Sequence, residues 1–250
     1  MSGDDYIRGI LRKYAVNTYA AEAAANAVAP SIRTWAGAQL ASLSFSGSFA
    51  KGTANNIGTD IDLFISLRSD TQETLKQIYE SLVVWANNRG WNPRRQNVSV
   101  GISYAGSKID LVPGRIQSGY QNVHSLYRSK TDSWTQTNIK THIDKVSGSG
   151  RIEEIRAIKI WRNLHSLSFP SFYLELFLIQ ALAGKTRGNV AMNVFTALSS
   201  IGNSLSNTRI VDPANTNNVI SGDLSATEKA SVANQARISA NKQYWREILW

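Results

Sequence analysis

The chain has 250 residues, of which 42% are hydrophobic and 18% are charged, a composition typical of a folded globular protein and not of a disordered one. It contains no cysteine, which excludes a disulfide scaffold and a thiolate metal site. Lysine and arginine number 27 against 18 acidic residues, a net charge of +9. Such a charge attracts polyanions such as nucleotides, nucleic acid or acidic lipid headgroups, although a solubility charge without a partner explains it equally well. There is no apolar run of about 18 residues and the first residues lack the apolar core of a secretory signal, so we expect a cytoplasmic protein outside the membrane.

The first 115 residues indicate an α/β unit. Apolar residues at helical spacing predict two helices within residues 5–40, interrupted at Pro30. A capping-box pattern at residues 70–73 predicts a helix that runs to about Asn88, with Gly90 just past its end. Alternation of apolar and polar residues predicts strands, and a proline is expected to stop the last of them. The predicted strands are residues 42–48, 60–67, 98–104 and 108–112, followed by Pro113.

The pattern changes at about residue 150, where strand signals fade and helical spacing continues. A second capping box, at residues 225–228, announces the last helix. We therefore expect an α+β fold of two lobes, with substrates bound in the cleft between them. The catalytic lobe, a mixed sheet with flanking helices, would span residues 1–145, with helical residues 1–40 that could pack on both lobes, and the helical nucleotide-binding lobe would span residues 146–250. The predicted helices of the second lobe are residues 151–165, 171–183, 189–204 and 224–245.

Three aspartates are the candidate catalytic residues. Asp60 and Asp62 alternate with Ile61 and Leu63 on a predicted strand, so the two carboxylates project from one face. Their repulsion makes ionisation costly, and a hard divalent cation such as Mg²⁺ would relieve that cost. Asp110, a lone acid in an apolar strand, would complete a centre for two Mg²⁺ or Mn²⁺ ions. Such a two-metal centre activates an attacking hydroxyl and stabilises the leaving pyrophosphate. Two surface aspartates on a strand also occur without any metal.

A glycine-serine pair precedes these acids. Gly47 would let the backbone approach a phosphate, Ser48 offers a hydroxyl and an amide N–H, and Lys51 adds positive charge. The pair, a gap of eleven residues, an Asp-x-Asp strand and a later aspartate on a neighbouring strand resemble the signature of the DNA-polymerase-β-like nucleotidyltransferases. The fuller string GSFAKGTANNIGTDIDLFI resembles one branch of that superfamily. This branch contains the archaeal CCA-adding enzymes, the oligoadenylate synthetases and the bacterial synthases of cyclic oligonucleotide signals.

The resemblance continues more weakly through residues 30–245. Residues 156–161 resemble an R-x-x-K-x-W helix of this branch, which implies that Lys159 contacts the triphosphate of a nucleotide. Residues 134–142 are similar to a T-D-P-x-x-H segment in which Asn138 and Ile139 replace the D-P pair. That similarity implies a phosphate contact for His142, although a lone histidine is more often structural.

Residues 170–176 resemble the P-S-Y-x-L-E-L stretch of the oligoadenylate synthetases. The resemblance implies that Ser171 lies near the phosphates and that Phe172 or Tyr173 stacks on the base, where an aromatic ring contributes about 1–3 kcal/mol. Glu175, inside an apolar helix, is assigned a structural role. Residues 212–219 are similar to a D-P-x-N-x-x-N-V element of the signal synthases, and their composition also predicts a turn.

Together these features predict a template-independent, metal-dependent nucleotidyltransferase that uses NTPs, ATP first among them, and releases pyrophosphate. The favoured product is a linear or cyclic oligonucleotide signal of the anti-phage type. An alternative acceptor is RNA or a tRNA 3′ end, as in a CCA-adding enzyme or a toxin, and a further alternative is a small molecule. RNA is also a possible activator of the enzyme. A catalytically silent nucleotide- or RNA-binding module is the alternative of another class. Base preference, product linkage and oligomeric state stay open.

Overall fold

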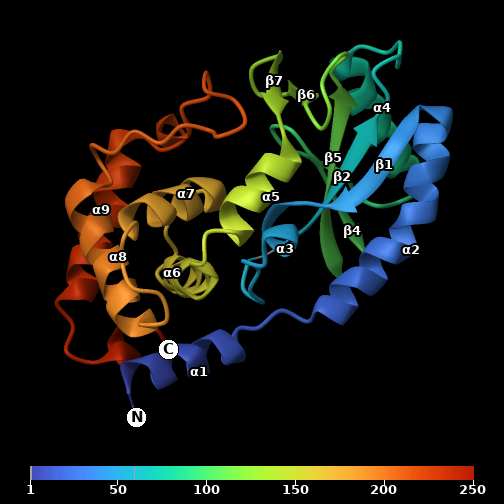
Figure 1. Ribbon diagram of the computed structural model, residues 1–250. Coiled ribbons are helices and arrows are strands. Elements are labelled where there is room, and N and C mark those ends of the chain that lie inside the picture. The colour runs from blue at the N-terminus through green and yellow to red at the C-terminus, as the bar shows by residue number, and fades with distance from the viewer. Residues whose placement is uncertain (1, 59) are drawn as a thin grey trace. The chain divides into compact units, whose positions relative to one another are not determined.

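The computed structural model describes residues 2–58 and 60–250 and is drawn as a ribbon in Figure 1. The chain divides into two compact units. Segments Asn17–Ala50 and Asp60–Ile143 form the sheet unit, and segments Met1–Val16, Lys51–Thr59 and Asp144–Trp250 form the helical unit. The expected α+β class is confirmed. Within the described residues, every helix is too short or too polar to cross a membrane.

The sheet unit is built on a mixed seven-stranded sheet of order β1-β2-β5-β4-β3, with β6 pairing β5 and β7 pairing β6. Strand β2 runs parallel to β5 and antiparallel to β1. Alternate residues of β2 (Ile61, Leu63 and Ile65) are buried in one core with apolar residues of helices α2 (Thr18–Ala36) and α4 (Leu75–Asn88), which cover one face of the sheet (Figure 1). The strands are β1 (Leu40–Phe45), β2 (Ile61–Leu67), β3 (Arg94–Arg95), β4 (Val100–Tyr104), β5 (Ser107–Ile116), β6 (His124–Arg128) and β7 (Ser133–Thr137).

Strand β5 continues through Pro113, so the prediction that this proline stops the strand is wrong. On one side Pro113 lies opposite Ile65 of β2. On the other side, β4 pairs only as far as Leu111 and β6 begins to pair at Arg115. Proline is tolerated at such an edge position, because no ladder hydrogen bond is required there.

Two helix predictions in this unit are also wrong. Helix α2 runs unbroken through Pro30, because its buried stripe of alanine, valine and isoleucine packs on the sheet and compensates for the missing N–H. The capping box that begins α4 is formed by Thr74 and Gln77 instead of residues 70–73. Asp70 accepts hydrogen bonds from the Arg68 guanidinium instead.

Strands β3, β6 and β7 and helix α5 (Ile139–Ser147) have no counterpart among the sequence predictions. The β6–β7 hairpin is rich in serine, threonine and glutamine, so it lacks the alternation of a half-buried strand. Its pairing with β5 is confined to Arg115 with Ser125 and Ile116 with His124, a ladder too short to leave a pattern in the sequence.

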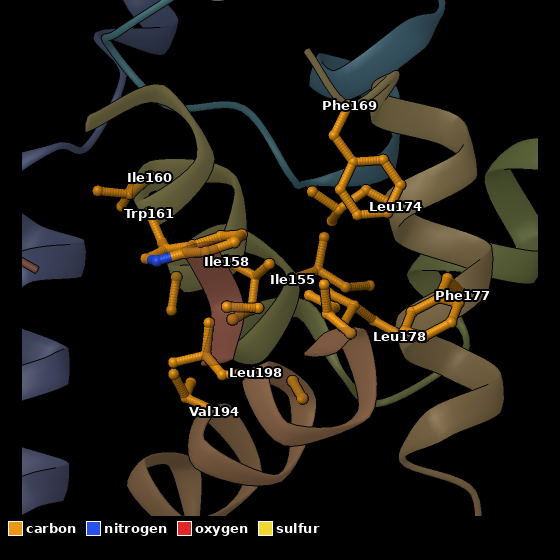
Figure 2. Close-up of a cluster of buried hydrophobic side chains, with 14 of the residues drawn as sticks. Ile155, Ile158, Ile160, Trp161, Phe169, Leu174, Phe177, Leu178, Val194 and Leu198 are labelled. Atoms are coloured by element: carbon orange, nitrogen blue, oxygen red, sulfur yellow. The ribbon is translucent and has the colours of Figure 1, made fainter. Parts of the chain in front are cut away.

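The helical unit buries a second core, in which Trp161 is completely enclosed. Figure 2 shows this packing, in which Ile155 and Ile158 belong to one cluster with Phe177, Leu178, Val194 and Leu198. Helix α1 (Gly3–Lys13) belongs to this unit, and Asp4 Oδ1 accepts a hydrogen bond of 2.7 Å from the Ala191 amide at the start of α8. The other helices are α6 (Ile152–Leu164), α7 (Ser171–Ala181), α8 (Val190–Ser204) and α9 (Ala226–Ala240).

Three of these four helices lie within two residues of their predicted limits, and the Ser225–Glu228 capping box of α9 is confirmed. Helix α9 ends at Ala240, short of the predicted residue 245. Trp245 lies instead in the short 3-10 helix Trp245–Glu247.

Candidate functional site

The parallel pairing of β2 and β5 aligns two of the three aspartates. Asp62 lies directly opposite Asp110 in the register. Their strand neighbours Ile61, Leu63, Ile109 and Leu111 are buried in the core, so both carboxylates project from the face that α2 and α4 do not cover. Asp60 lies one residue before β2 begins and is close enough for its charge to act on Asp110.

The surroundings of Asp110 change the pKa of its carboxyl group. Its residue is only 9% exposed, and burial, reinforced by the charge of Asp60, raises its pKa above the ordinary aspartate value. Arg94 and a hydrogen bond from Gln96 oppose the rise. Gln96 Nε2 donates to Asp110 Oδ1 at 2.9 Å, and Arg94 Nη2 lies 3.9 Å from Asp60 Oδ2. These aspartates therefore still favour an additional positive charge.

Arg94 and Gln96 are site residues that the sequence reasoning missed. A Cβ on Gly101 of β4 would lie 2.9 Å from both of their side chains and 3.0 Å from Asp110 Oδ1. An isolated glycine inside an alternating strand marks such a close approach, so Gly101 was the available signal. The polar residues at 94–96 carry no such signal, because their neighbourhood depends on the pairing of β3 with β4.

Gly47 occupies the turn between β1 and the short helix α3 (Gly47–Lys51). Its φ is +56°, and a Cβ at this position would lie 1.7 Å from Asp62 Oδ2. The Ser46 amide donates to the Asp62 carbonyl at 2.9 Å. Gly47 is thus required both by its backbone conformation and by its closeness to the carboxylate, and Ser48, which follows it, is partly exposed.

The three carboxylates have the donor chemistry of a magnesium site. Among the described residues, no three histidine, aspartate or glutamate side chains are grouped tightly enough to enclose an ion. Mg²⁺ does not need such a cage, because proteins hold it through one or two carboxylates together with water and substrate phosphates. The oxygen donors and the raised pKa of Asp110 are compatible with this open kind of binding.

A pocket of about 300 Å³ lies on the same face of the sheet, lined by Phe64 and Ser66 of β2 and by His124 of β6. Ser66 Oγ and His124 Nε2 are 2.7 Å apart. Burial lowers the pKa of His124, which favours the neutral ring. Lys140 of α5 also lines the pocket, which thus combines an apolar wall with neutral hydrogen-bonding groups and one cationic side chain.

The helical unit holds a second, oppositely charged cluster, formed by Lys51, Thr53, Lys159 and Glu175. Glu175 Oε2 accepts from Lys51 Nζ at 2.8 Å, and its Oε1 accepts from Thr53 Oγ1 at 2.6 Å. Lys159 Nζ lies 3.3 Å from both Glu175 Oε1 and Thr53 Oγ1. Lys159 is 1% exposed and Glu175 is fully buried, so the carboxylate is the internal counterion of the two lysines.

Burial dominates the electrostatics of this cluster. It lowers the pKa of Lys159 to about 8, with Glu175 opposing the fall and Arg162 and Lys51 adding to it. Burial alone would raise the pKa of Glu175, but Lys51 and Lys159 outweigh it and hold that pKa below the ordinary value. Glu175 is therefore a carboxylate in a buried ion-pair network.

The remaining predicted site residues occupy different environments. Arg162 Nη1 donates to Ser171 Oγ at 3.0 Å, and the Phe172 ring lies 4.5 Å beneath Lys51 Nζ. Tyr173 is fully buried and its ring packs edge-on against Phe169, which leaves Phe172 as the ring with accessible surface. His142 is half-buried on α5, in the sheet unit.

The sequence matches no protein-family model and no curated protein, but the fold matches solved structures. CdnC of Escherichia coli MS115-1, in a complex with HORMA-deltaN, is 19% identical with a TM-score of 0.75, and the match covers 94% of this chain and 88% of that chain. CD-NTase CdnG of Bradyrhizobium diazoefficiens, in complex with GTP, is 12% identical with a TM-score of 0.78 and coverage of 96% and 90%. The CdnE cyclic dinucleotide synthase of Elizabethkingia meningoseptica, with GTP and Apcpp, is 10% identical with a TM-score of 0.65 and coverage of 88% and 92%. The chain therefore has the fold of these proteins, which confirms the expected resemblance at the level of fold.

Proposed function

We propose that this protein is a metal-dependent nucleotidyltransferase that joins an NTP, ATP first among the candidates, to a hydroxyl acceptor and releases pyrophosphate. The observation that carries the proposal is the β2–β5 register, which sets Asp62 opposite Asp110 beside the Gly47 turn. The fold shared with CdnG in complex with GTP and with a cyclic dinucleotide synthase supports the same chemistry.

Asp60, Asp62 and Asp110 would hold two Mg²⁺ ions, or Mn²⁺. The bound metal supplies positive charge that makes an attacking hydroxyl more acidic and neutralises the leaving pyrophosphate. Arg94 and Gln96 orient Asp60 and Asp110. The Gly47 turn gives phosphate oxygens access to the backbone N–H and hydroxyl of Ser48.

In the helical unit, Lys51, Lys159 and Ser171 would serve the triphosphate and Phe172 the base. Lys51 keeps a small exposed edge, whereas Lys159 is enclosed by Thr53 and Glu175. A triphosphate would therefore meet Lys51 directly and would feel Lys159 through its charge, or contact it after it leaves Glu175. His142 is retained as a candidate phosphate contact.

The favoured acceptor is a second nucleotide, which makes the product a linear or cyclic oligonucleotide signal of the anti-phage type. The pocket lined by Phe64, Ser66 and His124 supports this choice, because a planar base uses both apolar walls and neutral hydrogen-bonding groups. A ligand of that kind would lie on the same sheet face as Asp62 and Asp110.

RNA is the second candidate acceptor or activator, and the net charge of +9 favours it. For an RNA partner, the logarithm of the binding constant should fall with the logarithm of the salt concentration with a slope of several units, because each neutralised phosphate releases counterions. Salt-independent RNA affinity would argue against this candidate.

The test is to incubate the protein with Mg²⁺ or Mn²⁺ and each labelled NTP, with and without bulk tRNA. We expect pyrophosphate release and a small labelled product, and resistance of that product to phosphatase identifies a cyclic molecule. Label transferred to RNA would replace the signal-synthase assignment. Absence of turnover under every condition would leave a silent nucleotide-binding module.

A further inference from the structure

Glu175 is a fully buried carboxylate in helix α7, which is otherwise apolar along most of its length. A charge in such a place is costly unless it is paired and hydrogen-bonded. Both of its oxygens are satisfied, Oε2 by Lys51 and Oε1 by Thr53 and Lys159. These partners come from two other segments of the chain, so Glu175 ties them to α7.

The segment that Glu175 contacts, Lys51 to Thr53, follows Gly47 and Ser48 along the chain. Lys51 is the last residue of α3, the helix that begins at Gly47, and Thr53 follows two residues later. Glu175 therefore holds Lys51 and Thr53 within the helical unit. The ring of Phe172 beneath Lys51 Nζ, at 4.5 Å, adds a cation–π contact to the same lysine.

Glu175 also raises the pKa of Lys159 against the effect of burial. The charged groups that face Lys159 are Glu175 on α7, Arg162 on α6 and Lys51, and burial already lowers the pKa of Lys159 to about 8 with Glu175 in place. Without the carboxylate, two buried ammonium groups and a guanidinium would repel one another, and the pKa of Lys159 would fall further.

We propose that Glu175 is a positioning residue of the nucleotide site, which holds Lys51 and Lys159 together and in place for the triphosphate of an incoming NTP. It acts through the two lysines and does not touch the nucleotide. The inference rests on the proposed function and extends the structural role that its position in an apolar helix implies.

The experiment compares Glu175→Gln with Glu154→Gln, a matched control. Glu154 is likewise buried in the helical unit, where it pairs with Arg151 and accepts a hydrogen bond from Asn193. Binding of a non-hydrolysable ATP analogue with Mg²⁺ is measured by calorimetry from pH 6 to pH 9, and folding is followed by circular dichroism. Glu175→Asp, which restores the charge on a shorter side chain, serves as the rescue variant.

We expect Glu175→Gln to weaken binding of the analogue about tenfold or more at pH 7.5, because a charged partner is lost from the network. In the wild type, affinity should fall as the pH rises through about 8, where Lys159 loses its proton. In Glu175→Gln that midpoint should move down by about one pH unit. Glu175→Asp should recover most of the affinity, and Glu154→Gln should keep both the affinity and the pH profile of the wild type.

Wild-type affinity and an unchanged pH profile in a folded Glu175→Gln variant would overturn the inference, as would an equal loss in Glu154→Gln. If Glu175→Gln does not fold, Thr53→Val removes one hydrogen bond from the same carboxylate and should weaken binding about threefold. Wild-type affinity in a folded Thr53→Val variant would then reject the role. Failure of the wild type itself to bind the analogue would reject the proposed function. Normal binding by the wild type that Glu175→Gln leaves unchanged would reject only the role of Glu175.

Discussion

In the sheet unit, three aspartates lie close together with Arg94 and Gln96 among their polar partners, whereas in the helical unit two lysines share the buried carboxylate of Glu175. The first cluster has excess negative charge, and burial, reinforced by the charge of Asp60, raises the pKa of Asp110. The second is enclosed and contains its own counterion. The aspartates should therefore matter for chemistry more than for stability, and the lysine–glutamate cluster should matter for both.

Asp62→Asn is expected to give the largest effect. Loss of one metal ligand removes several kcal/mol of transition-state stabilisation, and since each 1.36 kcal/mol is a factor of ten, NTP turnover should fall at least about 100-fold. The melting temperature should stay the same or rise, because one charge leaves a repelling group. Asp70→Asn, which changes an exposed acid paired with Arg68, is the control and should turn over NTP normally. Near wild-type activity in Asp62→Asn and Asp110→Asn would refute the metal assignment.

Gly47→Ala tests whether the backbone next to Asp62 belongs to the site in the sheet unit. The left-handed φ of +56° should cost about 1–2 kcal/mol of unfolding free energy with alanine, and the Cβ would also push Asp62 aside, so turnover should fall by about two orders of magnitude. The control is Gly90→Ala, because Gly90 has a similar φ of +71° and a Cβ added there would have no atom within 4 Å. It should show the loss of stability, measured by urea unfolding, without the loss of turnover. Equal turnover in the two variants would mean that the Gly47 turn is not part of the site.

Lys159→Met preserves most of the buried volume while removing the charge. We expect the apparent affinity for NTP to fall about tenfold, as for one charge-assisted contact, with kcat changed less than KM. Lys185→Met, on an exposed lysine of the same unit, provides the control in steady-state assays. An unchanged KM in Lys159→Met would reject the triphosphate role of Lys159.

The smallest expected effect is on acid stability. The folded-state pKa of Glu175 is lowered below its ordinary value of 4.5, so its contribution to stability is fully present above that pH and is lost as the pH falls through the folded pKa. Urea unfolding between pH 3 and pH 7 should therefore show a shallower acid decline in Glu175→Gln than in the wild type. A parallel decline in the two proteins would show that Glu175 does not titrate in this way.

Local sequence signals predicted the elements whose pattern is strong and whose ends are marked. Helices α6, α7 and α8 lie within two residues of their predicted limits, and the Ser225–Glu228 capping box begins α9. The predictions at Pro30 and Pro113 were wrong, because a helix packed on a sheet and a strand with a locally unpaired edge both tolerate proline. Strand β6 pairs with β5 over two residues and β7 pairs only with β6, and their polar composition hides the alternation typical of strands.

For the candidate site, the alternation along β2 was sufficient to indicate that Asp62 projects away from the core, since side-chain direction in a strand is a local property. Only the tertiary structure decided that Asp62 lies opposite Asp110, that Gly101 admits Arg94 and Gln96, and that Glu175 meets Lys51 across 124 residues of chain. Spacing along the chain determines the face on which a residue lies. The packing of the whole unit determines which residues of other elements it contacts. That packing distinguishes Asp110, which lies among other acids, from Glu175, which holds two lysines in place.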